Sequence, residues 1–137
     1  MGTNADVVRR LTDEAFIAGN FDTWDEIIAG DLVDNDPMQG LPPNGDGLKM
    51  LAQMVVGTFE DRKIDAEHLE SPDGRVVENW VFTGTHTGEA MGIPPSGKAI
   101  KIRGIEIWRV ADGKIAERWG VVDVSDVLEK AGLVPPS

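Results

Sequence analysis

One carboxylate inside an apolar run is well suited to acid/base chemistry. Glu106 interrupts the apolar pair Ile105 and Ile107. In a β-strand, its side chain would share one face with Gly104 and Trp108. A carboxyl group among such neighbours is withdrawn from water, which raises its pKa and suits a general acid or base. The opposite strand phase would turn Glu106 outward or into an ion pair at a dimer interface, and the sequence leaves both readings open.

Two further groups of residues are candidates for proton transfer. His86 closes a Thr-rich run and could act as an acid or base near neutral pH, or could simply fix a strand end by hydrogen bonds. Asp34, Asn35 and Asp36 are consecutive; carboxylates held this close can share a proton, although Asp and Asn also favour turns. His68 has acidic neighbours, and we expect it to be solvated.

Other side chains are candidates for substrate binding. A cross-strand ion pair, or a site for a substrate oxygen, could be formed by Arg103, Glu117 and Arg118. Aromatic rings can stack on a flat ligand, but they are also common in cores and interfaces. The candidate rings are Trp80, Trp108 and Trp119.

The composition excludes several classes of protein. With 137 residues, the chain is expected to form a single domain, residues 1–137. A net charge of −11 argues against nucleic acid or an anionic membrane as a partner. Two distant histidines and no cysteine predict neither a metal site nor a disulfide, and no phosphate-binding loop indicates a nucleotide cofactor. The N-terminus lacks the apolar region of a signal peptide, so we expect a cytoplasmic protein.

The elements that must position these residues begin with three helices. Apolar spacing predicts a helix capped by Asn4 and ended by Gly19, then a short helix ended by Gly30. Residues 31–37 read as an extended piece before a proline. A strongly amphipathic helix is predicted over residues 46–59.

Antiparallel strands follow the helices. We predict strands over residues 63–70, 75–87, 99–110 and 114–124, and a short helix over 126–131. This order predicts an α+β fold with the helices packed on one face of the sheet. A curved sheet covered in this way forms an apolar pocket, which we expect Phe16, Leu51 and Val55 to line. Because the strands are apolar in both phases, we also predict a homodimer through the exposed sheet face.

Several motifs resemble the SnoaL-like polyketide cyclases of the nuclear transport factor two-like superfamily. They are GTHTGE at 84–89, MGIPPSGK at 91–98, RGIEIWRV at 103–110 and WGVVD at 119–123. The resemblance covers nearly the whole chain. It implies a cone-shaped α+β barrel with a deep pocket between a curved sheet and three helices. It also implies a cofactor-free enzyme, often dimeric through its sheet, that closes a ring in a polyketide ester by intramolecular aldol chemistry.

The resemblance also exposes a difference at the catalytic position. The family's catalytic aspartate falls on Gly120, and its nearby histidine falls on Glu106. The leading hypothesis is a cofactor-independent acid/base enzyme for a hydrophobic, polyketide-like small molecule. Glu106 or Asp36 would remove a proton α to a carbonyl, and His86 or Arg103 would polarise the oxygen. The alternatives are a non-catalytic small-molecule binding module, or a hydrolase or dehydratase on the same fold.

Overall fold

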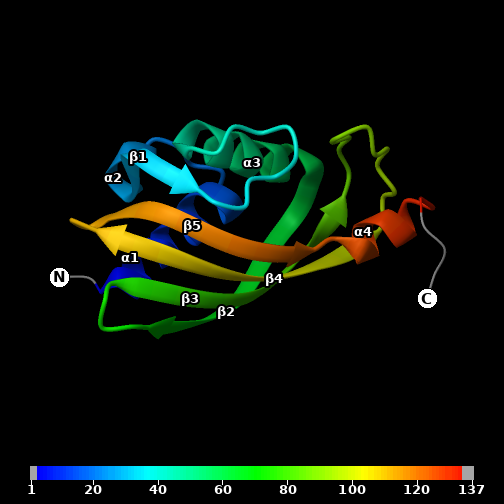
Figure 1. Ribbon diagram of the computed structural model, residues 1–137. Helices are drawn as coiled ribbons and strands as arrows, with labels where there is room; N and C mark the ends of the chain where they lie inside the picture. Colours follow the sequence, from blue (N-terminus) through cyan, green and yellow to red (C-terminus); the bar gives the residue numbers. More distant parts are fainter. Residues whose placement is uncertain (1–2, 134–137) are drawn as a thin grey trace.

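Helical segments at the N-terminus pack against a curved five-stranded sheet (Figure 1). The computed structural model describes residues 3–133. The helical segments are α1 Asn4–Arg10, the π-helix η1 Leu11–Ile17, α2 Trp24–Ile27, α3 Gly45–Thr58 and α4 Ser125–Lys130. The strands are β1 Ile28–Asp34, β2 Phe59–Glu70, β3 Arg75–His86, β4 Ala99–Ala111 and β5 Lys114–Asp123. The α+β prediction is confirmed.

The sheet is mixed rather than wholly antiparallel. Its strand order is β1-β5-β4-β3-β2, and β2 to β5 form the predicted antiparallel meander. β1 pairs with β5 in parallel and starts at Ile28, so the prediction that a helix continues to Gly30 is wrong. In residues 3–133, β1 and β2 are the two edges, and the sheet curves without closing into a barrel.

The first helix shows how local sequence sets an element's limits. Thr3, not the predicted Asn4, is the N-cap: its hydroxyl accepts from the Asp6 N–H at 3.2 Å. The Asp6 carboxylate accepts from the Thr3 N–H at 2.9 Å, which completes a capping box. The helix widens into η1 and ends at Gly19, whose φ of +68° is the left-handed conformation that glycine adopts easily.

A bulge near the start of β2 lies beside Arg62, whose side chain contacts the end of η1. Asp61 has a φ of +53°, and the pairing register with β3 shifts there. This bulge interrupts the alternation of the strand, so the sequence pattern predicted only the part of β2 from residue 63. The neighbouring Arg62 donates to the carbonyls of Ile17 at 2.8 Å and Phe59 at 2.8 Å. Arg62 therefore satisfies carbonyl groups at the end of η1 that the helix itself leaves without donors.

The alternation of β3 and β4 sends one set of side chains inward. Buried residues form two clusters, one around Leu11, Leu48 and Trp108, the other around Phe59 and Phe82. Members of both clusters line the cavity described below. The sheet thus supplies one wall and the helices supply the other.

Two structural features that would point to other classes of function are absent from residues 3–133. No helix there is long and apolar enough to span a membrane. The same residues contain no cluster of three or more His, Asp or Glu side chains arranged to hold a metal ion.

Candidate functional site

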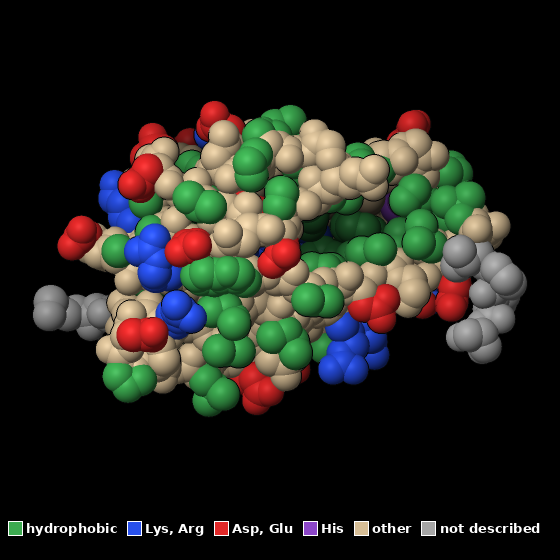
Figure 2. All heavy atoms as spheres, viewed as in Figure 1, with side chains coloured by type: hydrophobic (Ala, Val, Ile, Leu, Met, Phe, Trp, Pro, Cys, Tyr) green, Lys and Arg blue, Asp and Glu red, His purple; other side chains and the backbone are tan. Residues whose placement is uncertain are grey.

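A cavity of about 470 Å³ lies between the inner face of the sheet and the helices. Figure 2 shows its mouth as a dark hollow lined by apolar side chains. Most of the wall is apolar, which suits a hydrophobic ligand. The candidates from the sequence that line it are Phe16, Asp36, Leu51, Val55, Trp80, His86, Glu106 and Trp108.

The remaining candidates lie elsewhere. Asp34 is buried beside the cavity wall in an ion pair, and Asn35 donates to Glu117 at 3.0 Å. Arg103 and Trp119 belong to the outward strand phase and line a shallow depression on the opposite face of the sheet. Arg103 therefore does not reach a ligand in this cavity. This corrects the hypothesis that it polarises the substrate oxygen, because successive side chains of a strand point to opposite faces.

Glu106 is a buried carboxyl group in the cavity wall. It is 8% exposed, and its Oε1 accepts from the Trp80 indole N–H at 3.1 Å. Its Oε2 accepts from the Arg118 Nε–H at 3.0 Å. Burial raises the pKa of Glu106 to about 7; the Arg118 charge opposes this rise and the Glu78 charge adds to it. The inward position excludes the alternative in which Glu106 faces a dimer interface.

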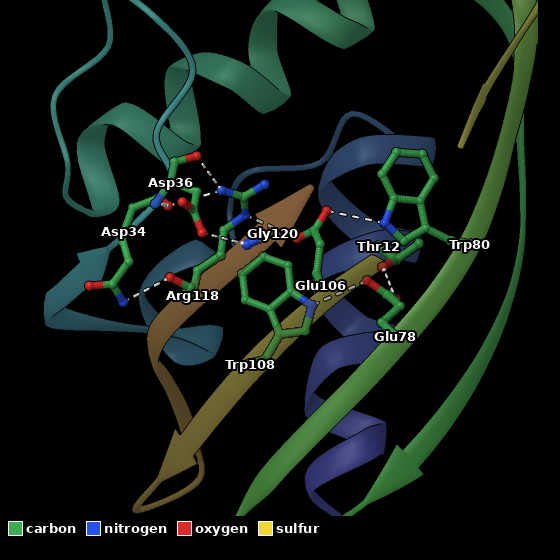
Figure 3. Close-up of polar contacts among 10 residues, drawn as sticks. Thr12, Asp34, Asp36, Glu78, Trp80, Glu106, Trp108, Arg118 and Gly120 are labelled. Atoms are coloured by element: carbon green, nitrogen blue, oxygen red, sulfur yellow. Dashed lines mark hydrogen bonds and ion pairs between the residues drawn. The ribbon is translucent and has the colours of Figure 1, made fainter. Parts of the chain in front are cut away.

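Arg118 is the centre of a buried polar network (Figure 3). Besides its bond to Glu106, it donates from Nη1 to the Asp34 carboxylate at 2.9 Å and to the Asp36 carbonyl at 2.8 Å. Its side chain is only 5% exposed, as is expected of a buried cation with several acceptors. Arg118 lines the cavity. From the sequence, Arg118 was a candidate for a cross-strand ion pair or for binding a substrate oxygen; its ion-pair partners are Asp34 and Glu106 rather than Glu117.

Gly120 leaves the space that the Arg118 guanidinium occupies. Gly120 lies directly across from Glu106 in the β4–β5 pairing. A Cβ atom at Gly120 would lie 2.8 Å from Arg118 Nη2 and 3.1 Å from Glu106 Cγ, too close without a shift. The backbone N–H of Gly120 donates to the Asp36 carboxylate at 2.9 Å. The space beside Gly120 therefore holds an arginine–glutamate pair.

Glu78 is a cavity residue that the sequence analysis missed. It is 3% exposed on β3 and accepts hydrogen bonds from Thr12 and Trp108. His68 Nε2 lies 2.9 Å from Glu78, and the histidine side chain is 5% exposed, so the prediction of a solvated His68 is wrong. The signal was present: Glu78 shares the inward strand phase of Trp80, where a carboxylate is unusual.

His86 lines the other end of the cavity. It is 1% exposed, packs against Phe59 with ring centroids 5.5 Å apart, and has Nδ1 at 3.4 Å from the Ser96 hydroxyl. His86 lies eight residues from Glu78 along β3, and Glu78 is the cross-strand partner of Glu106. At about 3.3 Å per residue, roughly 26 Å of strand separates His86 from the position of Glu106. His86 and Glu106 therefore cannot act on the same carbonyl group.

Comparison with known proteins gives one curated relative and many similar folds. Nogalonic acid methyl ester cyclase from Streptomyces nogalater is 26% identical over 120 residues, which cover 86% of this chain and 90% of that protein. The structure of IdmH from Streptomyces antibioticus, described as a candidate polyketide cyclase, has a TM-score of 0.79 and 29% identity. That match covers 96% of this chain and 99% of IdmH.

A similar fold also occurs in a protein described with a different chemistry. The structure of AclR from Streptomyces galilaeus, described as a candidate hydroxylase, has a TM-score of 0.81 at 21% identity and covers 98% of this chain and 83% of AclR. This likeness shows the fold alone, because one fold can carry several reactions. The family model of the SnoaL-like polyketide cyclases, in contrast, matches residues 6–130. The chain therefore belongs to the SnoaL-like polyketide cyclase family.

Proposed function

We propose that the protein is a cofactor-independent acid/base enzyme for a hydrophobic, polyketide-like small molecule, and that its reaction is an intramolecular aldol ring closure. The observation that carries the proposal is Glu106, a carboxyl group with a pKa of about 7 in the wall of an apolar cavity. Such a group exchanges a proton readily at neutral pH. Similarity to a polyketide ester cyclase supports the substrate class.

In the proposed mechanism, Glu106 is the base and Arg118 stabilises the oxygen. Glu106 takes a proton α to a carbonyl, and the electron pair of the broken C–H bond moves onto the carbonyl oxygen as an enolate. Within residues 3–133, no acceptor bonds Arg118 Nη2, so this N–H group is available to the enolate oxygen. The enolate carbon then forms a C–C bond with a second carbonyl, whose oxygen takes the proton back from Glu106.

A binding module without catalysis is the second candidate. Gly120, at the position that matches the family's catalytic aspartate, is the observation that favours it. Both candidates require a hydrophobic ligand in the cavity, but only the enzyme requires Glu106 to exchange a proton. Ligand binding without turnover would favour the binding module.

Filling the cavity is expected to block the ligand. Leu51 lines the cavity from α3, whereas its neighbour Met50 is 48% exposed and does not. We expect Leu51→Trp to weaken binding of 2-naphthol, a neutral aromatic probe, by about tenfold or more, which corresponds to about 1.4 kcal/mol. Fluorescence titration measures this. Met50→Trp is the matched control and should bind like the wild type; equal binding by both variants would contradict a ligand site in this cavity.

We also propose that the outer face of the sheet pairs with a second copy of the chain. Ile105 is 55% exposed and Val121 is 78% exposed, and the two are direct cross-strand neighbours. Ile107 and Trp119 form the next such pair on the same face. Contiguous apolar surface of this kind marks an interaction site. Two copies would cover it by packing sheet against sheet.

A charge in this patch is expected to separate the two copies. Ile105→Lys would bring two lysines together at the pairing of the sheets, where desolvation and repulsion oppose association. Sedimentation velocity should show a dimer for the wild type and a monomer for Ile105→Lys. Met50→Lys adds the same charge on exposed α3 and should remain dimeric. A monomeric wild type at high micromolar concentration would refute the dimer.

A further inference from the structure

The proposed mechanism leaves one buried carboxylate of the cavity unused. Glu78 is 3% exposed and lines the same cavity as Glu106. Its Oε2 accepts from the Thr12 hydroxyl at 3.1 Å and lies 2.9 Å from His68 Nε2. Its Oε1 accepts from the Trp108 indole N–H at 3.2 Å. With His68 in the tautomer that carries its hydrogen on Nε2, three donors face Glu78, an arrangement that suits the acceptor oxygens of a carboxylate.

The strand register places this carboxylate beside Glu106. Glu78 on β3 and Glu106 on β4 are direct cross-strand partners on the inward face. The two indoles cross between the strands: Trp80 of β3 donates to Glu106 at 3.1 Å, and Trp108 of β4 donates to Glu78. Figure 3 shows the two carboxyl groups side by side between these rings. Directly opposed like charges on neighbouring strands are unfavourable, so one proton on the pair is favoured.

The surroundings make Glu106, rather than Glu78, the member of the pair that binds a proton more readily. The three donors to Glu78 come from η1, β2 and β4, and none of them also bonds Glu106. Glu106 has one indole and a guanidinium, Arg118 of β5, which it shares with Asp34 of β1. The Asp36 carboxylate near Gly120 adds a further negative charge at this end of the cavity. The Glu78 charge is one of the causes that hold the pKa of Glu106 near 7, after burial itself.

We propose that Glu78 is a positioning residue for Glu106: its carboxylate, fixed by Thr12, His68 and Trp108, is the neighbouring negative charge that strengthens Glu106 as a base. This inference rests on the proposed function, since it explains how the acid/base group is set. Glu78 needs no contact with the substrate for this role.

A titration of Glu106 in the protein without substrate tests the inference. The ¹³Cδ resonance of Glu106, identified by its loss in Glu106→Gln, is followed against pH by NMR. In Glu78→Gln, which keeps the shape and removes the charge, we expect the Glu106 midpoint to fall by about one pH unit. Glu67→Gln is the matched control, because Glu67 pairs with Asn79 on the outer face of the sheet. In this variant the titration midpoint of Glu106 should equal that of the wild type.

An unchanged Glu106 midpoint in folded Glu78→Gln would overturn the inference. If Glu78→Gln does not fold by circular dichroism, Glu78→Met decides, because it removes the same charge with a side chain of similar length. The Glu106 midpoint should again fall, and an unchanged midpoint in this variant would overturn the inference. The proposed function fails separately, through full turnover by Glu106→Gln. In active protein, the pH–rate profile of Glu78→Gln should move to lower pH together with the NMR midpoint.

Discussion

Glu106→Gln is expected to lower the turnover of a polyketide methyl ester by about 100- to 10,000-fold, the usual contribution of a positioned acid or base. The amide keeps the size of the side chain and can still accept from one of its two donors, Trp80 or Arg118, but its NH2 group then faces the other donor, and it cannot carry the proton. Steady-state kinetics measures the loss, and a binding titration with 2-naphthol should show that the cavity still takes a ligand. Wild-type turnover by this variant would remove Glu106 from the mechanism and favour Asp36, or a binding protein.

The same variant should change how stability depends on pH. Burial raises the pKa of Glu106 from 4.5 to about 7, so the folded state holds this proton more tightly than the unfolded chain. The resulting stability is full below pH 4.5 and is lost as pH rises through 7, a change on the order of 3 kcal/mol. Urea unfolding of Glu106→Gln at several pH values should lack this decline. Asp6 and Asp123 have pKa values lowered from 3.8, so they change the stability of the protein only at pH values below this range.

Arg118→Met is expected to have the largest effect on folding, a loss of about 3–5 kcal/mol in the free energy of unfolding. The change removes the cation from between Asp34 and Glu106 and leaves both buried carboxyl groups without it. Arg118 and Asp34 are only 5% and 4% exposed, so water cannot replace the lost bonds. Urea denaturation measures the difference at neutral pH.

Arg109→Met is the matched control for this loss. Arg109 also pairs with a carboxylate of β5, Glu117, but the two side chains are 40% and 24% exposed. A pair this accessible to water contributes about 0–1 kcal/mol. Equal losses of unfolding free energy in Arg118→Met and Arg109→Met would contradict the claim that burial makes the Arg118 ion pairs important for stability. A stable, inactive Arg118→Met would leave Arg118 with a role in the reaction but not in folding.

Glu106 and Arg118 also account for the glycine at position 120. The register places Gly120 beside Glu106, and a side chain at Gly120 would collide with the Arg118 guanidinium. A carboxylate at 120 and this position of Arg118 therefore exclude each other. The proposed base thus comes from β4, and the cation beside it comes from β5.

Short-range pattern was sufficient for much of the fold. The helical spacing of α3 and the alternation of β3, β4 and β5 are properties of neighbouring residues, and the structure has these elements within one or two residues of the predicted limits. The same alternation placed Glu106 in phase with Gly104 and Trp108, but it left open whether that phase faces the helices or the solvent. Burial of that phase against the helices then selects the inward reading.

The sequence by itself therefore determined the fold class, the meander, and the strand phase that carries Glu106. Only the tertiary structure decided that β1 pairs in parallel with β5, that Arg118 lies between Glu106 and Asp34, and that Glu78 stands beside Glu106. The reason is physical: the Arg118–Asp34 bond joins residues 84 positions apart, and the Thr12–Glu78 bond joins residues 66 apart. No local periodicity encodes such partners, because they meet only once the register of the sheet and the packing of the helices are set.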